Sequence, residues 1–384
     1  MVTTAKATGA ARPRLIRTLN EQLLLERMRA SGPVSRGDLA SASGLSKPTV
    51  ALALTTLEQD ALVQHAGRRV GGRGRSASLY EIRTDAGFVL GLDVGREFIR
   101  GAIADLAGTV RARRSRATRS SSGAARVREL GGLAYELLRE VGVDSRGNLL
   151  QTVVGSPGVV EPDGRALQLA PNLPGWERPT VLRDLRRLLG SETMIENDVD
   201  AAAVAERDHG HGRDFSTFAF VSVGTGIGMG LVLDGELHRG AHGAAGEIAF
   251  LPLADGSLES AVSGAAVVAA ARRAGSPLPS ARDVFAAAEA GDPGAREVVA
   301  AEATIVAHAL VSIVAVVDPE LIVLGGGIGR APGFAEAVLG RLAELSPLVP
   351  EVRPSALGED AVVDGCLAVG GDRLWERVLS SRLT

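Results

Sequence analysis

The sequence predicts an α/β protein in which a small winged helix-turn-helix module precedes a much larger body with two lobes. Three observations predict this fold class. Residues 35–57 contain two short helical patterns on either side of a Gly-Leu turn. A loop rich in glycine and arginine follows, between two strand patterns. From Phe88 onward one order of strands and helices occurs twice, which implies two lobes around a cleft.

The first part of the chain predicts a tail and one helix. Residues 1–13 are small and polar, so we expect them to be disordered. Residues 15–30 keep apolar side chains at helical spacing, and Ser-Gly-Pro at 31–33 ends the pattern. The module that contains this helix is expected over residues 14–83.

Two further helical patterns follow. Ser35, with Asp38 three residues later, is the capping-box pattern that begins a helix. Gly44 suits the left-handed residue that ends one. Ser46 then begins a second helix, with Pro48 in its first turn. This layout is typical of a helix-turn-helix, whose second helix lies in the DNA major groove. The alternative is a helical hairpin inside an enzyme.

The loop at residues 65–75 predicts a wing. It carries four glycines and four arginines, and it joins strand patterns that begin at 62–63 and run over 78–82. Arginines of such a wing contact phosphates or enter the minor groove. The alternative is a solvated, flexible loop.

The distribution of charge supports double-stranded DNA as a partner. Residues 1–90 carry 13 Lys and Arg against 7 Asp and Glu, so this part has a net charge of +6 and the remainder has −9. An arginine run at 111–119 is either a second DNA contact or, as we favour, a solvated strand face. The residues expected to contact DNA are Arg36, Ser46, Lys47, Thr49, Arg73 and Arg75.

Composition excludes several classes of protein. Cys366 is the single cysteine, which excludes an internal disulfide and any site built from several cysteines. The N-terminus has no apolar signal core, so we expect a cytoplasmic protein. Charged residues and glycines interrupt the apolar stretches, so we expect no membrane-spanning segment.

The body, residues 88–384, predicts a duplicated architecture. Three meandering strands, a helix and a further strand describe half of an actin-like, ribonuclease H-like fold. Lobe one is expected over 88–195 together with a C-terminal helix at 366–384, and lobe two over 196–365. The expected elements are 88–95, 98–105, 110–118, 124–141 and 149–155, then 194–196, 197–206, 218–223, 230–233, 263–273, 295–317, 321–324 and 366–379.

Several motifs in this order resemble the ROK family, which contains bacterial sugar kinases and sugar-responsive repressors. The resemblance extends over about residues 14–380, and the repressors of the family carry an N-terminal winged helix, as predicted here. The motifs that carry it are Ser46–Val50, Gly91–Gly95, Ala170–Trp176, Glu196–Asp200, Gly224–Gly228, Gly240–Glu247 and Leu324–Gly327.

The resemblance also implies where the phosphates of ATP lie in a kinase. They rest against an Asp-x-Gly-Gly-Thr turn and a Gly-Thr-Gly loop, and the loop is intact at 224–226. The turn departs from the pattern, because Arg96 and Glu97 replace its second Gly and its Thr. A long side chain and a carboxylate there oppose a polyanion, so we expect no cofactor and no catalysis. Asp198 is the position that matches the kinase general base.

A sugar pocket is the second implication of the resemblance. Asn197 and Asp198 also stand where a helix begins, so one alternative is that they cap it. The family's His is replaced by Phe250, and the three cysteines of its zinc motif are absent, so we expect no metal. The residues expected to bind the ligand are Asn172, Asn197, Asp198, Glu247 and Glu259.

Together these features predict a DNA-binding transcriptional regulator, most simply a repressor, controlled by a sugar or sugar derivative in the cleft. Near-palindromic operators imply a homodimer or homotetramer. One alternative is an active, ATP-dependent sugar kinase with a DNA-binding head. The other is a regulator whose cleft binds no small molecule.

Overall fold

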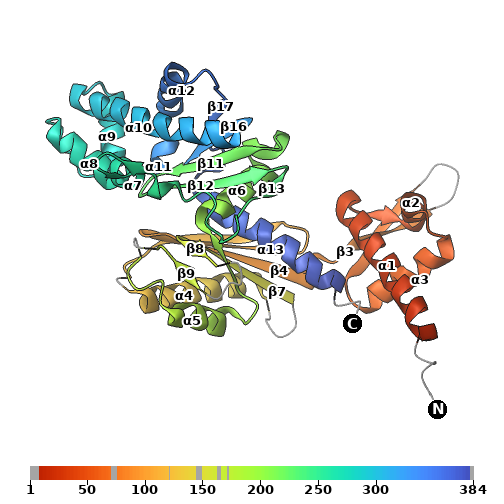
Figure 1. Cartoon of the computed structure of the whole chain (residues 1–384). Helices are drawn as coiled ribbons and strands as arrows, with labels where there is room; N and C mark the ends of the chain where they lie inside the picture. Colours follow the sequence, from red (N-terminus) through yellow and green to blue (C-terminus); the bar gives the residue numbers. More distant parts are fainter. Residues whose placement is uncertain are drawn as a thin grey trace, which may run out of the picture.

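The computed structural model describes residues 8–70, 76–120, 122–143, 149–161, 166–170 and 173–380. A head, residues 8–83, lies at one end of a body, residues 87–380, and the two lobes of the body lie one above the other (Figure 1). The marked C-terminus lies beside the junction of head and body.

The head combines three helices with a three-stranded antiparallel sheet. Its elements are α1 (Thr8–Ser31), β1 (Val34–Ser35), α2 (Arg36–Ser43), α3 (Lys47–Gln59), β2 (Val63–Val70) and β3 (Ser76–Ile82), with β3 in the middle of the sheet. The predicted capping box is confirmed: the Ser35 hydroxyl accepts from the Asp38 N–H at 3.2 Å, and the Asp38 carboxylate accepts from the Ser35 N–H at 3.0 Å. The arrangement is compatible with the predicted winged helix.

Two expectations about the head need correction. The helix α1 begins at Thr8, inside the segment 1–13 that we expected to be disordered, and residues 1–7 lie outside the described residues. Alanines in this first turn are strong helix formers. The strand β2 continues through a bulge after His65 as far as Val70, so the first half of the expected loop is paired with β3.

Lobe one is a five-stranded sheet with helices on both faces. Its elements are β4 (Gly87–Val94), β5 (Phe98–Asp105), β6 (Val110–Ala117), α4 (Gly123–Val141), β7 (Leu149–Ser156), α5 (Pro179–Leu189) and β10 (Met194–Asn197), in the sheet order β10-β7-β4-β5-β6. Leu90 and Leu92 pack toward α4 and α5, whereas Val89 joins the core on the other face. Alternation along β4 therefore buries both faces. The small ribbon of β8 (Val159–Val160) and β9 (Leu167–Gln168) follows β7.

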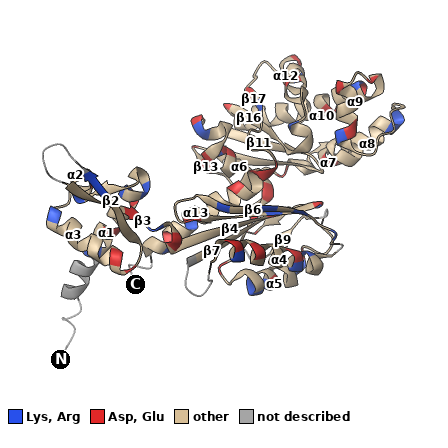
Figure 2. Cartoon of the chain, turned by 180° about the vertical axis from the view of Figure 1, so that it is seen from behind, with Lys and Arg blue, Asp and Glu red and all other residues tan. Residues whose placement is uncertain are grey.

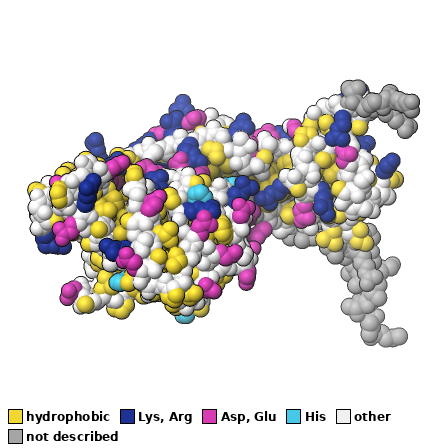
Figure 3. All heavy atoms as spheres, turned by 90° about the horizontal axis from the view of Figure 1, so that it is seen from above, with side chains coloured by type: hydrophobic (Ala, Val, Ile, Leu, Met, Phe, Trp, Pro, Cys, Tyr) yellow, Lys and Arg dark blue, Asp and Glu magenta, His cyan; other side chains and the backbone are white. Residues whose placement is uncertain are grey.

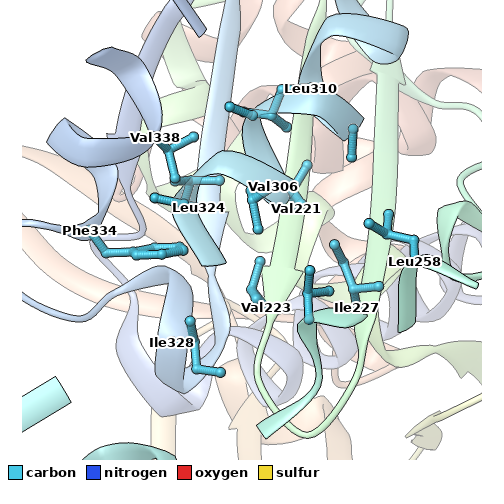
Figure 4. Packing of buried hydrophobic residues seen from close by; sticks show 14 of the residues in the cluster. Val221, Val223, Ile227, Leu258, Val306, Leu310, Leu324, Ile328, Phe334 and Val338 are labelled. Atoms are coloured by element: carbon cyan, nitrogen blue, oxygen red, sulfur yellow. The ribbon is translucent and has the colours of Figure 1, made fainter. Parts of the chain in front are cut away.

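Lobe two repeats this architecture. Its sheet has the order β13-β12-β11-β16-β17, built from β11 (Phe218–Val223), β12 (Ile227–Leu233), β13 (Glu236–Leu237), β16 (Leu321–Gly325) and β17 (Glu351–Pro354). Val221 and Leu324 pack against the long helix α10 (Pro293–Val317), through residues such as Val306 (Figure 4). The remaining elements are α6 (Asp198–His209), β14 (Pro252–Leu253), β15 (Gly256–Ser257), α7 (Leu258–Val262), α8 (Gly264–Arg273), α9 (Ala281–Glu289), α11 (Gly326–Gly329) and α12 (Phe334–Leu345).

The expectation that no segment is apolar enough to span a membrane was wrong for α10. This 25-residue helix meets that test by length and composition, with a mean hydropathy of 2.0 over its most apolar window. Half of that window is buried inside the fold, where α10 supplies much of the core of lobe two. A buried core helix passes the same test as a membrane span, so this feature is weak evidence for a membrane.

The two lobes meet through a pair of helices. The last helix, α13 (Ala361–Ser380), lies on the sheet of lobe one and packs against α6, which lies on the sheet of lobe two. At their crossing a Cβ on Gly365 would overlap the carbonyl oxygen of Ala201, so the backbones approach closely there. Because α13 begins at Ala361, it also starts five residues earlier than the sequence predicts.

The head shares its hydrophobic core with the body. One continuous cluster joins Leu24 and Met28 of α1 to Trp375 of α13 and to Val89 of β4. The indole N–H of Trp375 donates to the Leu106 carbonyl at 3.1 Å, and the Gln22 amide donates to the Leu379 carbonyl at 2.8 Å. The helix α13 therefore contacts the head at one end and the lobe junction at the other.

Candidate functional site

Three carboxylates that the sequence assigns to the ligand site lie near enough for two of them to act on the third. Asp198 begins α6, Glu247 precedes a short 3₁₀ turn at 248–250, and Glu259 lies in the first turn of α7. Burial raises the pKa of Glu247, and the charges of Asp198 and Glu259 raise it further, so the three groups interact. Burial also raises the pKa of Asp198 to about 6.

Asn197 caps the start of α6, which is one of the two roles that the sequence allows for it. Its side-chain oxygen accepts from the N–H groups of Val199 at 2.9 Å and Asp200 at 3.0 Å, as an N-cap does. Its amide donates to the carbonyl of Gly158 at 3.0 Å. Both ends of the side chain are thus occupied by backbone groups. Asn197 thus fixes the start of α6 and thereby positions Asp198, and its assignment to the ligand stays a prediction. Asn172 lies outside the described residues.

A second layer of charge lies beside these carboxylates. The buried Glu196 accepts two hydrogen bonds from Arg239: its Oε1 accepts from Nε at 3.3 Å, and its Oε2 accepts from Nη2. Burial and the Glu196 charge raise the pKa of Asp200 and the Arg239 charge opposes them, which leaves it at about 8. The Asp200 Oδ1 has no hydrogen-bond partner within the described part of the chain. Asp198 and Asp200, two positions apart at the start of α6, therefore both have pKa values raised well above the ordinary carboxyl range.

Asp93 forms an ion pair that sequence reasoning missed. It lies directly opposite Arg100 in the β4–β5 register, and the Arg100 Nη1 contacts its Oδ2 at 3.2 Å. The Arg100 Nη2 contacts the Glu359 Oε2 at 2.8 Å, just before α13. Burial raises the pKa of Asp93 to about 7, and Arg100 opposes that shift. Asp93 and Arg100 flank a tight turn between two predicted strands, so hairpin register was the signal that would have found the pair.

Hydrogen bonds from Arg126 fix the turn that departs from the phosphate-binding pattern. Arg126 of α4 is buried and donates to the carbonyls of Gly95, Arg96 and Ser120. These contacts fix the backbone of the turn, while the side chains of Arg96 and Glu97 are exposed at its surface.

The Gly-Thr-Gly loop also faces a carboxylate. Gly224 donates to the Gly226 carbonyl at 2.9 Å, and its own carbonyl accepts from Gly264 at 2.8 Å. A Cβ on Gly226 would lie 3.2 Å from the Glu259 Oε2. A phosphate against this loop would therefore approach a negative charge, which repels it.

The head surface has one exposed cation at the start of α3 and several residues with internal partners. Lys47 is exposed, whereas the hydroxyls of Ser46 and Thr49 bond to each other at 2.8 Å. Arg36 of α2 lies 5.2 Å from the ring centroid of Tyr80. Arg73 and Arg75 lie outside the described residues. A further wing arginine, Arg69, pairs with Asp38 at 3.0 Å, so its charge is partly engaged within the head.

The arginine-rich strand β6 supports the solvated-face interpretation. Its arginines pair with acidic groups of the same chain, and Figure 2 shows basic and acidic segments interspersed along the ribbon of the body. The pairs are Arg111–Asp105, Arg113–Asp360, Arg113–Asp364, Arg114–Glu140 and Arg116–Glu136. Among the described residues, no three His, Cys, Asp or Glu side chains are placed to hold a metal ion.

Comparison with known proteins places the body in a family. The family model described as "ROK family" matches residues 89–369. The xylose repressor of Bacillus subtilis is 23% identical over 62% of this chain, and the match spans only 61% of the length of that repressor. The N-acetylmannosamine kinase of Salmonella typhi is 31% identical over 65% of this chain and 86% of the kinase.

The fold of nearly the whole chain, head included, has a counterpart among solved structures. A ROK family transcriptional regulator, a homologue of the E. coli MLC protein, superposes with a TM-score of 0.75 at 21% identity, and covers 96% of this chain and 99% of its own. Because only 21% of the residues are identical, the similarity shows a shared fold and nothing more. The two-lobed body of this chain has the actin-like, sugar-kinase type of α/β fold. The match of the family model over residues 89–369 shows that this chain belongs to the ROK family.

Proposed function

We propose that this protein is a cytoplasmic, DNA-binding transcriptional regulator, a repressor whose cleft binds a sugar or sugar derivative. The observation that carries the proposal is the head: a capped helix pair with an exposed second helix, packed in one continuous core with a ROK body. The superposed regulator covers 96% of this chain. The solved structure of a hexokinase of the same family, from Thermus thermophilus, covers only 75% of it.

DNA recognition is assigned to a winged helix-turn-helix made of the head. In this arrangement α3 enters the major groove, and Lys47 at its first turn lies near phosphates or bases. Ser46 and Thr49 lie at the start of the same helix, and the free N–H groups of a helix N-terminus favour a phosphate oxygen. Arg36 of α2 is exposed and extends the basic surface. Arg73 and Arg75 are proposed to contact the DNA backbone from the wing.

Effector binding is assigned to the acidic cleft. Asp198, Glu247 and Glu259 present carboxylate oxygens from three separate elements, which suits the hydroxyl groups of a polyol. Asn172 is proposed to complete the pocket. The printed name of the B. subtilis relative, a xylose repressor, supports a sugar as the class of ligand.

Kinase activity is the second candidate, because Asp198 matches the family's general base and the Salmonella relative is a kinase. Three features of the site oppose it. Phosphoryl transfer needs phosphates that are bound and neutralised. Here Glu259 lies against the Gly-Thr-Gly loop, Glu97 replaces the Thr of the other turn, and Arg100 already engages Asp93. A coupled assay with ATP and a panel of hexoses decides between the two: turnover at ordinary enzyme rates would replace our proposal.

Ligand binding is tested by thermal shift with pentoses, hexoses, amino sugars and their phosphates. We expect one class to raise the melting temperature of the wild type and not that of Asp198→Ala. Asp208→Ala, at the far end of the same helix, is the matched control and should keep the response. A panel without any hit would favour the regulator whose cleft binds no small molecule.

DNA binding by the head is tested with restriction fragments of genomic DNA and with duplexes selected from a random library. We expect the full chain to enrich near-palindromic duplexes as a homodimer or homotetramer, with binding that weakens as salt rises. Lys47→Ala should weaken specific binding. Failure to enrich any sequence would contradict the assignment of the head.

A further inference from the structure

The outward face of α3 is apolar. Val50, Ala53, Leu54 and Leu57 are buried, and they mark the side of the helix that packs on the head. At 100° per residue, the opposite side is centred on Pro48, Leu52 and Thr55, with Gln59 at the C-terminal end of the helix. Leu52 is 52% exposed, although it is a large hydrophobic residue in the middle of a helix. The core of the head does not explain its presence there.

From Pro48 to Leu57, before Gln59 at the last position of the helix, this face offers almost no hydrogen bonds to the edge of a base. Between Pro48 and Leu57 the helix has no Arg, Lys, Asn, Gln, Asp or Glu, the side chains that read guanine, adenine or cytosine. The hydroxyl of Thr55 is engaged, because it donates to the carbonyl of Ala51 at 3.0 Å. What remains at the centre of the face is the isobutyl group of Leu52.

The surroundings of Leu52 suit a nucleic acid. A shallow groove of about 210 Å³ between α1 and α3 is lined by Leu52, Thr49, Ile16, Arg17 and Asn20, together with Ala53. Arg17, which lines the groove, is an exposed cation, Lys47 is another at the start of α3, and α3 has no acidic residue in its first turn. Figure 3 shows hydrophobic side chains interspersed with cations on the surface of the head. An apolar side chain on a surface that also carries cations suits a base whose neighbouring phosphates are negative.

We propose that Leu52 reads thymine, by packing against the 5-methyl group that thymine alone presents in the major groove. This inference rests on the proposed DNA-binding function and specifies how the head selects its operator. Phosphate contacts by Lys47 and Arg17 would set the register, and the methyl contact would set the sequence. The operator half-site should therefore carry thymines where the second turn of α3 lies.

The experiment uses the full-length protein and duplexes selected by it from a random library. In a selected duplex, each conserved thymine is replaced singly by deoxyuridine, which removes only the 5-methyl group. For wild type we expect one or two positions at which the replacement raises Kd about fourfold, the loss that a buried methyl group predicts. In Leu52→Ala the same replacements should leave Kd unchanged.

Leu348→Ala is the matched control, because Leu348 is a similarly exposed leucine, at 56%, in the body. It should keep the response of wild type to deoxyuridine. An equal response in wild type and Leu52→Ala, or no response in wild type, would overturn the inference while leaving DNA binding intact. A changed oligomeric state of Leu52→Ala with an unchanged response would assign the patch to a contact between chains. Failure to select any duplex would instead count against the proposed function.

Discussion

Glu302 is an acid that the fold buries without a compensating charge. It lies on α10 with 4% exposure, and its Oε1 has no hydrogen-bond partner among the described residues. Burial alone raises its pKa to about 8. Because the folded state favours the protonated form, this group destabilises the fold increasingly as pH rises from the ordinary carboxyl range to about 8.

Replacement of this acid by its amide should remove the penalty. We expect Glu302→Gln to raise the melting temperature at pH 8.5, and to raise it less at pH 5, where the native carboxyl is already protonated. Glu297→Gln, at an exposed position of the same helix, is the control and should show no such difference. Equal gains at the two pH values would contradict the assigned ionisation.

Residues of the candidate site were only partly predictable. Asp198, Glu247 and Glu259 were predicted because they stand in motifs, and in the structure the charges of Asp198 and Glu259 both act on Glu247. The sequence could not decide whether Asn197 caps a helix or binds a ligand, because both uses need the same side chain at the same position. The Arg100 contact to Glu359 joins residues 259 positions apart, so only the folded chain reveals it.

At the scale of elements, α13 is the helix on which the arrangement of the lobes depends. Its Gly365 lies where a side chain would overlap the backbone of α6, whereas its Gly371 has no atom within 4 Å of a Cβ. A side chain at Gly365 is therefore excluded by lack of space. At Gly371 there is room for one, so glycine there only lowers the helix propensity.

These two glycines give a matched pair of substitutions. We expect Gly371→Ala to stabilise the protein by about 0.5–1 kcal/mol, the difference between Gly and Ala within a helix. Gly365→Ala should lower stability, since the two backbones must separate. Melting temperatures of both variants measure the difference. Equal effects would mean that α6 and α13 do not cross closely at Gly365.

Several strands and the longer helices were predictable, and the shorter helices of the body were not. The strands β5 and β11 have the bounds that the sequence predicts. Five helices of the body were missed: α5, α7, α9, α11 and α12. The helices α7 and α11 have only five and four residues, too few for a helical period to be evident. By contrast, α5 buries Val181, Leu182 and Leu185 at helical spacing, a signal that could have found it.

On the scale of the whole molecule, α13 connects the cleft to the head. Near its start, Asp360 and Asp364 pair with Arg113, and Glu359 just before it contacts Arg100. Near its end, Arg29 of the head lies 5.1 Å from the Trp375 ring centroid. A ligand that binds one arrangement of the lobes better than another would thereby change the position of the head.

The central claim is that a sugar in the cleft controls DNA binding by the head. Its most direct test is the DNA affinity of the full-length protein, measured by fluorescence anisotropy with and without the sugar that gives a thermal shift. We expect the sugar to weaken binding between about 5- and 150-fold, the usual range of allosteric coupling, and Asp198→Ala to abolish the effect. An unchanged DNA affinity with the sugar bound would contradict it.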